Sequence, residues 1–154
     1  MVKQLIFWIL FALVGSDTFT AKVIGVTDGD TIVVLDINKQ QIKVRLEGID
    51  CPESNQAFGN RAKQATVDLC FGKEVTVQKT GVDQYGRTLA YIFVDDLCIN
   101  KQLLSLGMAW HYKQYNKDQE LARLEIEARE KKIGLWSETN PIAPWDWRHK
   151  KKEF

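Results

Sequence analysis

The sequence predicts an α+β domain in which five short strands close into a small β-barrel and three helices pack against it. The chain has 154 residues, 45% of them hydrophobic, so it can bury one core and is short for two domains. Strand-like segments dominate as far as residue 94, with one helical segment between the third and the fourth, and helical periodicity follows. This order is typical of a barrel of OB type, which is a likeness of fold alone.

Three strands open the predicted fold. Residues 22–26 and 31–35 are rich in apolar and β-branched side chains, and the Asp28-Gly29 pair between them is a strong hairpin signal. In residues 42–46, apolar side chains alternate with lysine and arginine, which indicates a strand with one buried face.

A helix and two further strands come next. Apolar residues spaced four, three and four apart form one face of a helix over residues 58–69, and Gly72 ends it. Residues 75–77 and 89–94 are the fourth and fifth strands. Between and around them, turn residues such as glycine and aspartate separate the elements.

Two more helices are expected after the barrel. Apolar residues at helical spacing cover residues 99–106 and 121–128. Asp118 or Asn116 can cap the start of the later helix. Residues 137–154, which hold proline, tryptophan and lysine, are predicted as a tail of the domain.

The first residues have the features of a secretory signal peptide. Lys3 precedes an unbroken apolar run over residues 5–14, and the small residues Gly15 and Ser16 follow. A bilayer needs about twenty apolar residues, so this run is too short to span one. We expect residues 1–16 to be removed and the protein to be secreted or periplasmic.

The net charge and the number of cysteines limit what the rest of the chain can be. We expect one domain over residues 17–154, with its core at about 22–136 and a tail at 137–154. The chain carries +1, and the loss of one lysine with the leader leaves zero, which excludes a polycation. A local cluster of charge can still bind phosphate. Three cysteines allow one disulfide at most. They are Cys51, Cys70 and Cys98.

Five charged residues at turns and strand ends form the candidate active site. They are Asp30, Arg45, Asp50, Glu53 and Arg87. The carboxylates of Asp30 and Asp50 suit a divalent cation such as calcium. The two arginines suit a phosphate, because guanidinium groups bind its oxygens in pairs. Glu53 can orient or deprotonate a water molecule. Taken singly, each has an ordinary structural explanation as a turn, a surface pair or a capped loop.

In their order and spacing, these motifs resemble those of the staphylococcal nuclease (thermonuclease) family over about residues 22–136. The motifs are Asp28-Gly29-Asp30-Thr31, Arg45 through Asp50-Cys51-Pro52-Glu53, Asp83 through Tyr91, Asn100, Leu103, Gly107, Ala109 and Gly134-Leu135-Trp136. The resemblance implies an OB barrel with three helices and a secreted, calcium-dependent nuclease. It implies cleavage of DNA and RNA at the 5′-oxygen side of the phosphodiester, which leaves 3′-phosphates.

The resemblance also implies roles for individual residues. The side chains of Asp30 and Asp50 would bind calcium, together with the backbone carbonyl of Cys51. Arg45 and Arg87 would bind the phosphate and offset charge in the transition state.

By the same resemblance, Glu53 would be the general base or the residue that orients the water. The loop that follows it, residues 54–57, is much shorter than in the staphylococcal enzyme and lacks its lysines, and Gln84 replaces another lysine. Substrate affinity and preference therefore transfer less well than the chemistry.

Aromatic residues indicate how the substrate would bind. By the resemblance, Tyr85 and Tyr115 would stack unpaired bases, whereas Tyr112 aligns ambiguously. Aromatic packing under a loop is the alternative. We expect DNA and RNA substrates with single strands preferred, a monomer, and no membrane contact once the leader is gone.

Two other functions have to be weighed against a nuclease. Some domains of this family keep the barrel and lose the catalytic residues, so a weakly active or inactive nucleic-acid-binding module is possible. A barrel that binds sugars or peptides has no need of paired arginines facing carboxylates. All five candidate residues are present, which favours the enzyme.

Overall fold

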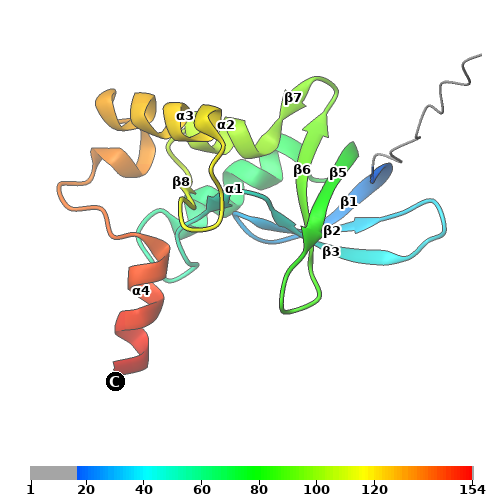
Figure 1. Ribbon diagram of the computed structural model, residues 1–154, viewed down its shortest axis with the longest axis horizontal. Coiled ribbons are helices and arrows are strands. Elements are labelled where there is room, and N and C mark those ends of the chain that lie inside the picture. Colours follow the sequence, from blue (N-terminus) through cyan, green and yellow to red (C-terminus); the bar gives the residue numbers. More distant parts are fainter. Residues whose placement is uncertain (1–16, 154) are drawn as a thin grey trace, which may run out of the picture.

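A five-stranded barrel forms the body of the molecule in a computed structural model that describes residues 17–153. Its strands are β1 (Thr18–Asp28), β2 (Thr31–Leu35), β3 (Gln41–Leu46), β5 (Glu74–Val82) and β6 (Thr88–Val94). They neighbour one another in the order β3-β2-β1-β5-β6, and parallel pairing of β3 with β6 closes the barrel (Figure 1). The fold predicted from the sequence is confirmed. A short β7 (Leu97–Cys98) continues beyond β6.

Apolar side chains on alternate strand positions fill the barrel. Val23, Val34, Val44, Val77 and Ile92 are fully buried. Two strands are longer than expected: β1 begins at residue 18, and β5 runs to residue 82. The additional residues of β1 include polar threonines that pair with β5, which apolar periodicity cannot detect.

The three predicted helices are present. They are α1 (Gly59–Cys70), α2 (Ile99–Ser105) and α3 (Gln119–Glu130). Of the two candidate caps for α3, Asp118 is the one used, since its Oδ1 accepts a 2.9 Å hydrogen bond from the amide of Glu120. The short 3₁₀ helix η1 (Gly134–Ser137) follows α3.

The predicted tail contains a fourth helix, α4 (Pro144–Lys150), which leads into the 3₁₀ helix η2 (Lys151–Glu153). Figure 1 shows it in red, on the opposite side of β8 from α3. The sequence predicted only a tail here and no helix, in a segment that contains Pro141 and Pro144. Proline is nevertheless well suited to the first turn of a helix, where its missing N–H is not needed.

A two-stranded ladder outside the barrel joins the middle of the chain to its helical half. β4 (Ile49–Asp50) pairs antiparallel with β8 (Trp110–His111), so that Asp50 lies opposite Trp110. Trp110, Leu135, Trp136 and Ala143 form a small apolar cluster distinct from the barrel core. Asp50 therefore lies close to the aromatic residues against which the C-terminal residues pack.

The cysteines and the leader bear on the expected export. Cys51, Cys70 and Cys98 are buried free thiols, without a disulfide among residues 17–153. Within the same residues, no helix has the length and apolar character needed to cross a membrane. The predicted signal peptide, residues 1–16, lies outside the described part of the chain.

Candidate active site

Four of the five predicted site residues lie close together. They come from the turn between β1 and β2, from the end of β3, and from β4 with the loop after it. β2 pairs with β3 so that Thr31 lies opposite Arg45, and Asp30 precedes Thr31. Asp50 ends β4, and Glu53 lies on the loop that leads to α1. Residues far apart in sequence thus meet at one end of the barrel.

Arg45 is at the centre of this group. Its Nη2 lies 3.1 Å from Oδ1 of Asp50 and 3.4 Å from Oδ2 of Asp30. Its Nη1 donates to the carbonyl oxygens of Leu46 and Ile49, at 3.0 and 2.8 Å. Burial opposes the charge of this guanidinium, but the two aspartates outweigh it and raise its pKa. Arg45 is therefore a fixed positive charge.

Asp30 is buried and held in one orientation. Its Oδ2 accepts a 2.7 Å hydrogen bond from the amide of Cys51, and its Oδ1 accepts one from the Thr31 hydroxyl. Burial alone would raise the pKa of Asp30, yet Arg45 and these hydrogen bonds lower it below its ordinary value. Asp30 is therefore ionised at neutral pH and available to a cation.

A further aspartate, which sequence reasoning assigned to the turn alone, belongs to the same cluster. Oδ1 of Asp28 accepts from the amide of Asp30 at 3.2 Å. Burial, reinforced by the charge of Asp30, raises the pKa of Asp28 to about 7. Its position two residues before Asp30 was visible in the sequence, but nothing there indicated that it would be partly buried beside another carboxylate.

Arg148 of α4 also reaches the site, and sequence reasoning missed it. Its Nη2 donates to Oδ2 of Asp50 at 2.7 Å, and its Nη1 donates to Oε1 of Glu53 at 2.7 Å. Asp50 is almost completely buried, and burial raises its pKa to about 6 even though the Arg148 hydrogen bonds lower it. The only sequence signal for Arg148 was its place directly after Trp145-Asp146-Trp147 in the predicted tail.

The structure does not bring the fifth predicted residue, Arg87, into contact with these carboxylates. Its Nε donates to Oδ2 of Asp83 at 2.7 Å, and its guanidinium lies 5.5 Å from the centre of the Tyr85 ring. Arg87 lies directly before β6, the strand that pairs with β3, on which Arg45 lies. The contact with Asp83 engages its Nε.

The two tyrosines predicted to bind bases are both exposed. Tyr85 is 75% exposed and Tyr115 is 70% exposed. The ring of Tyr115 meets the edge of Tyr112 at 4.8 Å between centroids, and Tyr112 stacks on Trp145 at 5.4 Å. Burial and the nearby charge of Asp50 raise the pKa of Tyr112, so this aromatic group adjoins the carboxylates.

The chemistry of these residues fits a divalent cation bound with water and substrate. Asp30 and Asp50 offer hard oxygens around one nitrogen of Arg45, and burial, reinforced by the charge of Asp30, raises the pKa of Asp50 to about 6. Among residues 17–153, no group of three or more histidine, cysteine, aspartate or glutamate side chains is arranged to hold a metal ion. Cations such as calcium and magnesium commonly complete their shells with waters and phosphate oxygens.

The thiol of Cys51 is a poor candidate for that cation. It is buried, and burial raises its pKa well above the ordinary value, so it remains protonated. The expected role of Cys51, in which only its backbone carbonyl binds the metal, stays a prediction.

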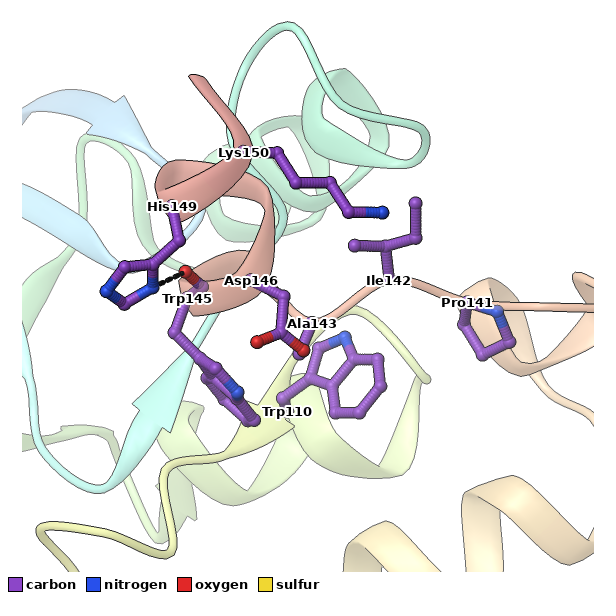
Figure 2. A pocket seen from close by; sticks show the side chains of 8 residues that line it. All are labelled: Trp110, Pro141, Ile142, Ala143, Trp145, Asp146, His149 and Lys150. Carbon is purple, nitrogen blue, oxygen red and sulfur yellow. Dashed lines mark hydrogen bonds between the residues drawn. The ribbon is translucent and has the colours of Figure 1, made fainter. Parts of the chain in front are cut away.

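A surface cavity of about 460 Å³ lies along α4 and does not include the predicted catalytic residues. Figure 2 shows Trp110 and Trp145 next to each other in its wall, with Asp146, His149 and Lys150 from α4 around them. Nδ1 of His149 lies 2.7 Å from the carbonyl oxygen of Trp145, within the helix. The carboxylates around Arg45 are therefore a separate feature, and their chemistry rather than a deep pocket identifies the site.

Comparison with known proteins agrees with this geometry. Residues 43–138 match the family model described as staphylococcal nuclease homologue. The matched segment contains Arg45, Asp50, Glu53 and Arg87, begins after Asp30 and ends before α4.

Several relatives carry names of nucleases. The chain is 41% identical over 148 residues to an "uncharacterized endonuclease" of Haemophilus influenzae, covering 96% of this chain and 83% of that protein. It is 44% identical over 145 residues to a micrococcal nuclease of Shigella flexneri, covering 87% and 83%. It is also 39% identical to a probable staphylococcal-like nuclease of Oryza sativa, covering 82% of this chain and 33% of that one. The chain therefore belongs to the staphylococcal nuclease family, and it is a nuclease.

Proposed function

We propose that this nuclease is a calcium-dependent phosphodiesterase that acts on DNA and RNA and cuts at the 5′-oxygen side to leave 3′-phosphates. The observation that carries the proposal is the convergence of Asp30 and Asp50 on one nitrogen of Arg45. Glu53 lies next to this group, because Arg148 contacts both Glu53 and Asp50. Carboxylates for a hard cation, a fixed cation for phosphate and a further carboxylate for water are thus adjacent.

Calcium would be held by the side chains of Asp30 and Asp50 and by the backbone carbonyl of Cys51. When bound, the ion supplies Lewis-acid stabilisation of charge on the phosphate oxygens. The carboxylate of Asp30 is already ionised and oriented by two hydrogen bonds, so it needs little rearrangement to bind.

Arg45 would stabilise charge on the phosphate during cleavage. Two backbone carbonyls and two carboxylates fix its guanidinium before any substrate arrives. A preorganised charge costs no reorientation at the moment of reaction, which is the main source of its catalytic effect. Arg87 would supply the second arginine, whose Nε is held by Asp83.

Glu53 would act on the attacking water. Its side chain is 37% exposed, in contrast to the buried Asp50, so water can reach it. In this position the carboxylate accepts or directs a proton of the water.

The exposed rings support a preference for single-stranded substrates. Tyr85 lies beside Arg87, and Tyr115 adjoins Tyr112 near Asp50. Each ring can stack an unpaired base, and stacking is tolerant of base identity. We further infer a monomer that is secreted or periplasmic, on the basis of the signal-like sequence of residues 1–16.

The test is cleavage of an end-labelled single-stranded DNA by the purified protein, with calcium and with excess chelator. We expect cleavage with calcium only, and products whose mobility changes after phosphatase treatment because they end in 3′-phosphates. Undiminished cleavage in the chelator would overturn the metal requirement. Products that resist phosphatase and carry 3′-hydroxyls would overturn the assigned side of the cut.

A further inference from the structure

We propose that Arg148, on the C-terminal helix α4, is a positioning residue of the active site that holds the carboxylate of Glu53 in its working orientation. The inference rests on the proposed function, in which Glu53 acts on the attacking water. Arg148 lies beyond the segment shared with the family model, which ends at residue 138.

The guanidinium of Arg148 connects the buried carboxylate of Asp50 to the more exposed carboxylate of Glu53. Arg148 binds both oxygens of Asp50, with Nη2 at 2.7 Å from Oδ2 and Nη1 at 3.2 Å from Oδ1. The same Nη1 donates to Oε1 of Glu53 at 2.7 Å. The Asp50 side chain is 1% exposed and lies in β4, whereas that of Glu53 is 37% exposed and lies on a loop. Arg148 therefore ties the orientation of Glu53 to the position of Asp50.

The loop that carries Glu53 is tied to the C-terminal segment, residues 141–150, at two further points. The side-chain carbonyl of Gln56 accepts from the amide of Glu53 at 3.1 Å, and its amide group donates to the carbonyl of Ile142. Nε1 of Trp147 donates to Oδ1 of Asn55 at 3.1 Å. Three successive contacts thus join a short loop to residues almost a hundred positions away.

The position of α4 does not depend on Arg148. Trp145 stacks on Tyr112, with ring centroids 5.4 Å apart and ring planes 4° apart, and it meets the edge of Trp110 at 5.5 Å. Figure 2 shows these two tryptophans together at the base of α4. Ala143 and Pro144 are also buried. Because aromatic packing anchors the helix, a change of Arg148 removes its contacts with the carboxylates without removing the helix.

Direct binding of phosphate is the competing role for Arg148. Both of its Nη atoms are already engaged by carboxylates, one of which is the residue that acts on water. A residue that works through Glu53 loses its importance when Glu53 is changed, whereas a residue that binds phosphate does not. This difference can be measured with a double-mutant cycle.

The experiment compares wild type, Arg148→Gln, Glu53→Gln and the double variant on single-stranded DNA with calcium. We expect Arg148→Gln to lower kcat about tenfold to a hundredfold, with KM changed by less than about twofold. In the Glu53→Gln background the same change should cost less than about twofold. Lys150→Gln is the matched control, since Lys150 lies on the same helix and makes no ion pair within residues 17–153; its kinetics should equal those of wild type.

Tryptophan fluorescence and melting temperature show whether α4 stays packed in each variant. Arg148→Lys, which keeps the charge but loses the paired contact, should give a kcat between those of wild type and Arg148→Gln. Three results would each overturn this inference but not the proposed function. They are an equal loss of kcat from Arg148→Gln with Glu53 or Gln at position 53, a raised KM with unchanged kcat, or full activity of Arg148→Gln. A wild-type protein that does not cleave would overturn the proposed function and this inference with it.

Discussion

The backbone amide of Cys51 donates a 2.7 Å hydrogen bond to Oδ2 of Asp30, although 21 positions separate the two residues. This contact fastens the start of the loop that carries Glu53 to the turn between β1 and β2. Gly29 permits the close approach, because a Cβ there would lie 2.9 Å from side-chain atoms of Cys51 and Ala62. The carboxylate that would bind calcium is thereby placed by a backbone amide as well as by the side chains of Thr31 and Arg45.

The first prediction concerns calcium. Asp30→Asn keeps an oxygen that can accept from the Cys51 amide, so the fold should persist, but the charge is lost. We expect calcium affinity to fall by about 1.5–3 kcal/mol, roughly tenfold to a hundredfold. Isothermal titration calorimetry measures this without reference to activity. Asp68→Asn, on the exposed face of α1, is the control. Equal affinities of the Asp30 variant and wild type would exclude Asp30 as a ligand.

The two arginines should respond differently to replacement by lysine. Each variant should lose about 2–4 kcal/mol of transition-state stabilisation, seen in kcat/KM, because the paired guanidinium contact is lost. Arg45→Lys should also lower the melting temperature, since Arg45 is buried and binds the carbonyls of Leu46 and Ile49. Arg87→Lys should leave it nearly unchanged, because Arg87 has one ion-pair partner, Asp83, and its side chain is 28% exposed against 12% for Arg45. Near-wild-type rates for both variants would mean that the arginines are structural.

The cysteines should be unreactive in the folded protein. Burial raises the pKa of Cys70 to about 11 and that of Cys51 well above its ordinary value, so the reactive thiolate is scarce at mildly alkaline pH. We expect iodoacetamide to modify Cys51 and Cys70 slowly in the native protein, faster as pH rises, and completely after denaturation. Mass mapping of the purified protein gives the site and extent of labelling. A disulfide that includes Cys51 would contradict the buried free thiol.

Local patterns were sufficient to predict the barrel and three helices. Alternation in residues 42–46 and the Asp28-Gly29 turn depend on neighbours in sequence, and both appear where expected. The pairing of β4 with β8 was not predictable, since two-residue strands carry no periodicity. Apolar periodicity did not identify α4 either, because the helix is anchored by contacts of Trp145 with Tyr112 and Trp110, which lie far away in the sequence.

The candidate site was predictable only in part. Asp30, Arg45, Asp50 and Glu53 follow turns and strand ends of one barrel face, so their meeting follows from the topology. Arg148 was missed because its partners lie 95 and 98 positions earlier, and no local pattern connects them. Arg87 pairs with Asp83, which is a choice of side-chain partner that sequence does not specify.

The last prediction concerns the form of the substrate. A small barrel presents little surface to a rigid duplex, whereas the exposed rings of Tyr85 and Tyr115 can each stack an unpaired base, a contact of about 1–3 kcal/mol. The near-neutral charge implies that few phosphates are bound, so salt should weaken cleavage only modestly. The short loop after Glu53 leaves the site open along the strand, which permits cuts within a chain as well as at its ends.

Initial rates on one sequence, prepared as a single strand, a stable duplex and a closed single-stranded circle, test this expectation. The single strand should be cut faster than the duplex, and the circle should be cut as well. Tyr115→Ala should raise KM for the single strand by about fivefold or more, the cost of one lost stacking contact, while exposed Tyr85 serves as an independent position for the same measurement. Equal rates on single strand and duplex, with no effect of Tyr115→Ala, would refute stacking. An uncut circle would show that the enzyme needs a free end, because an exonuclease can begin only there.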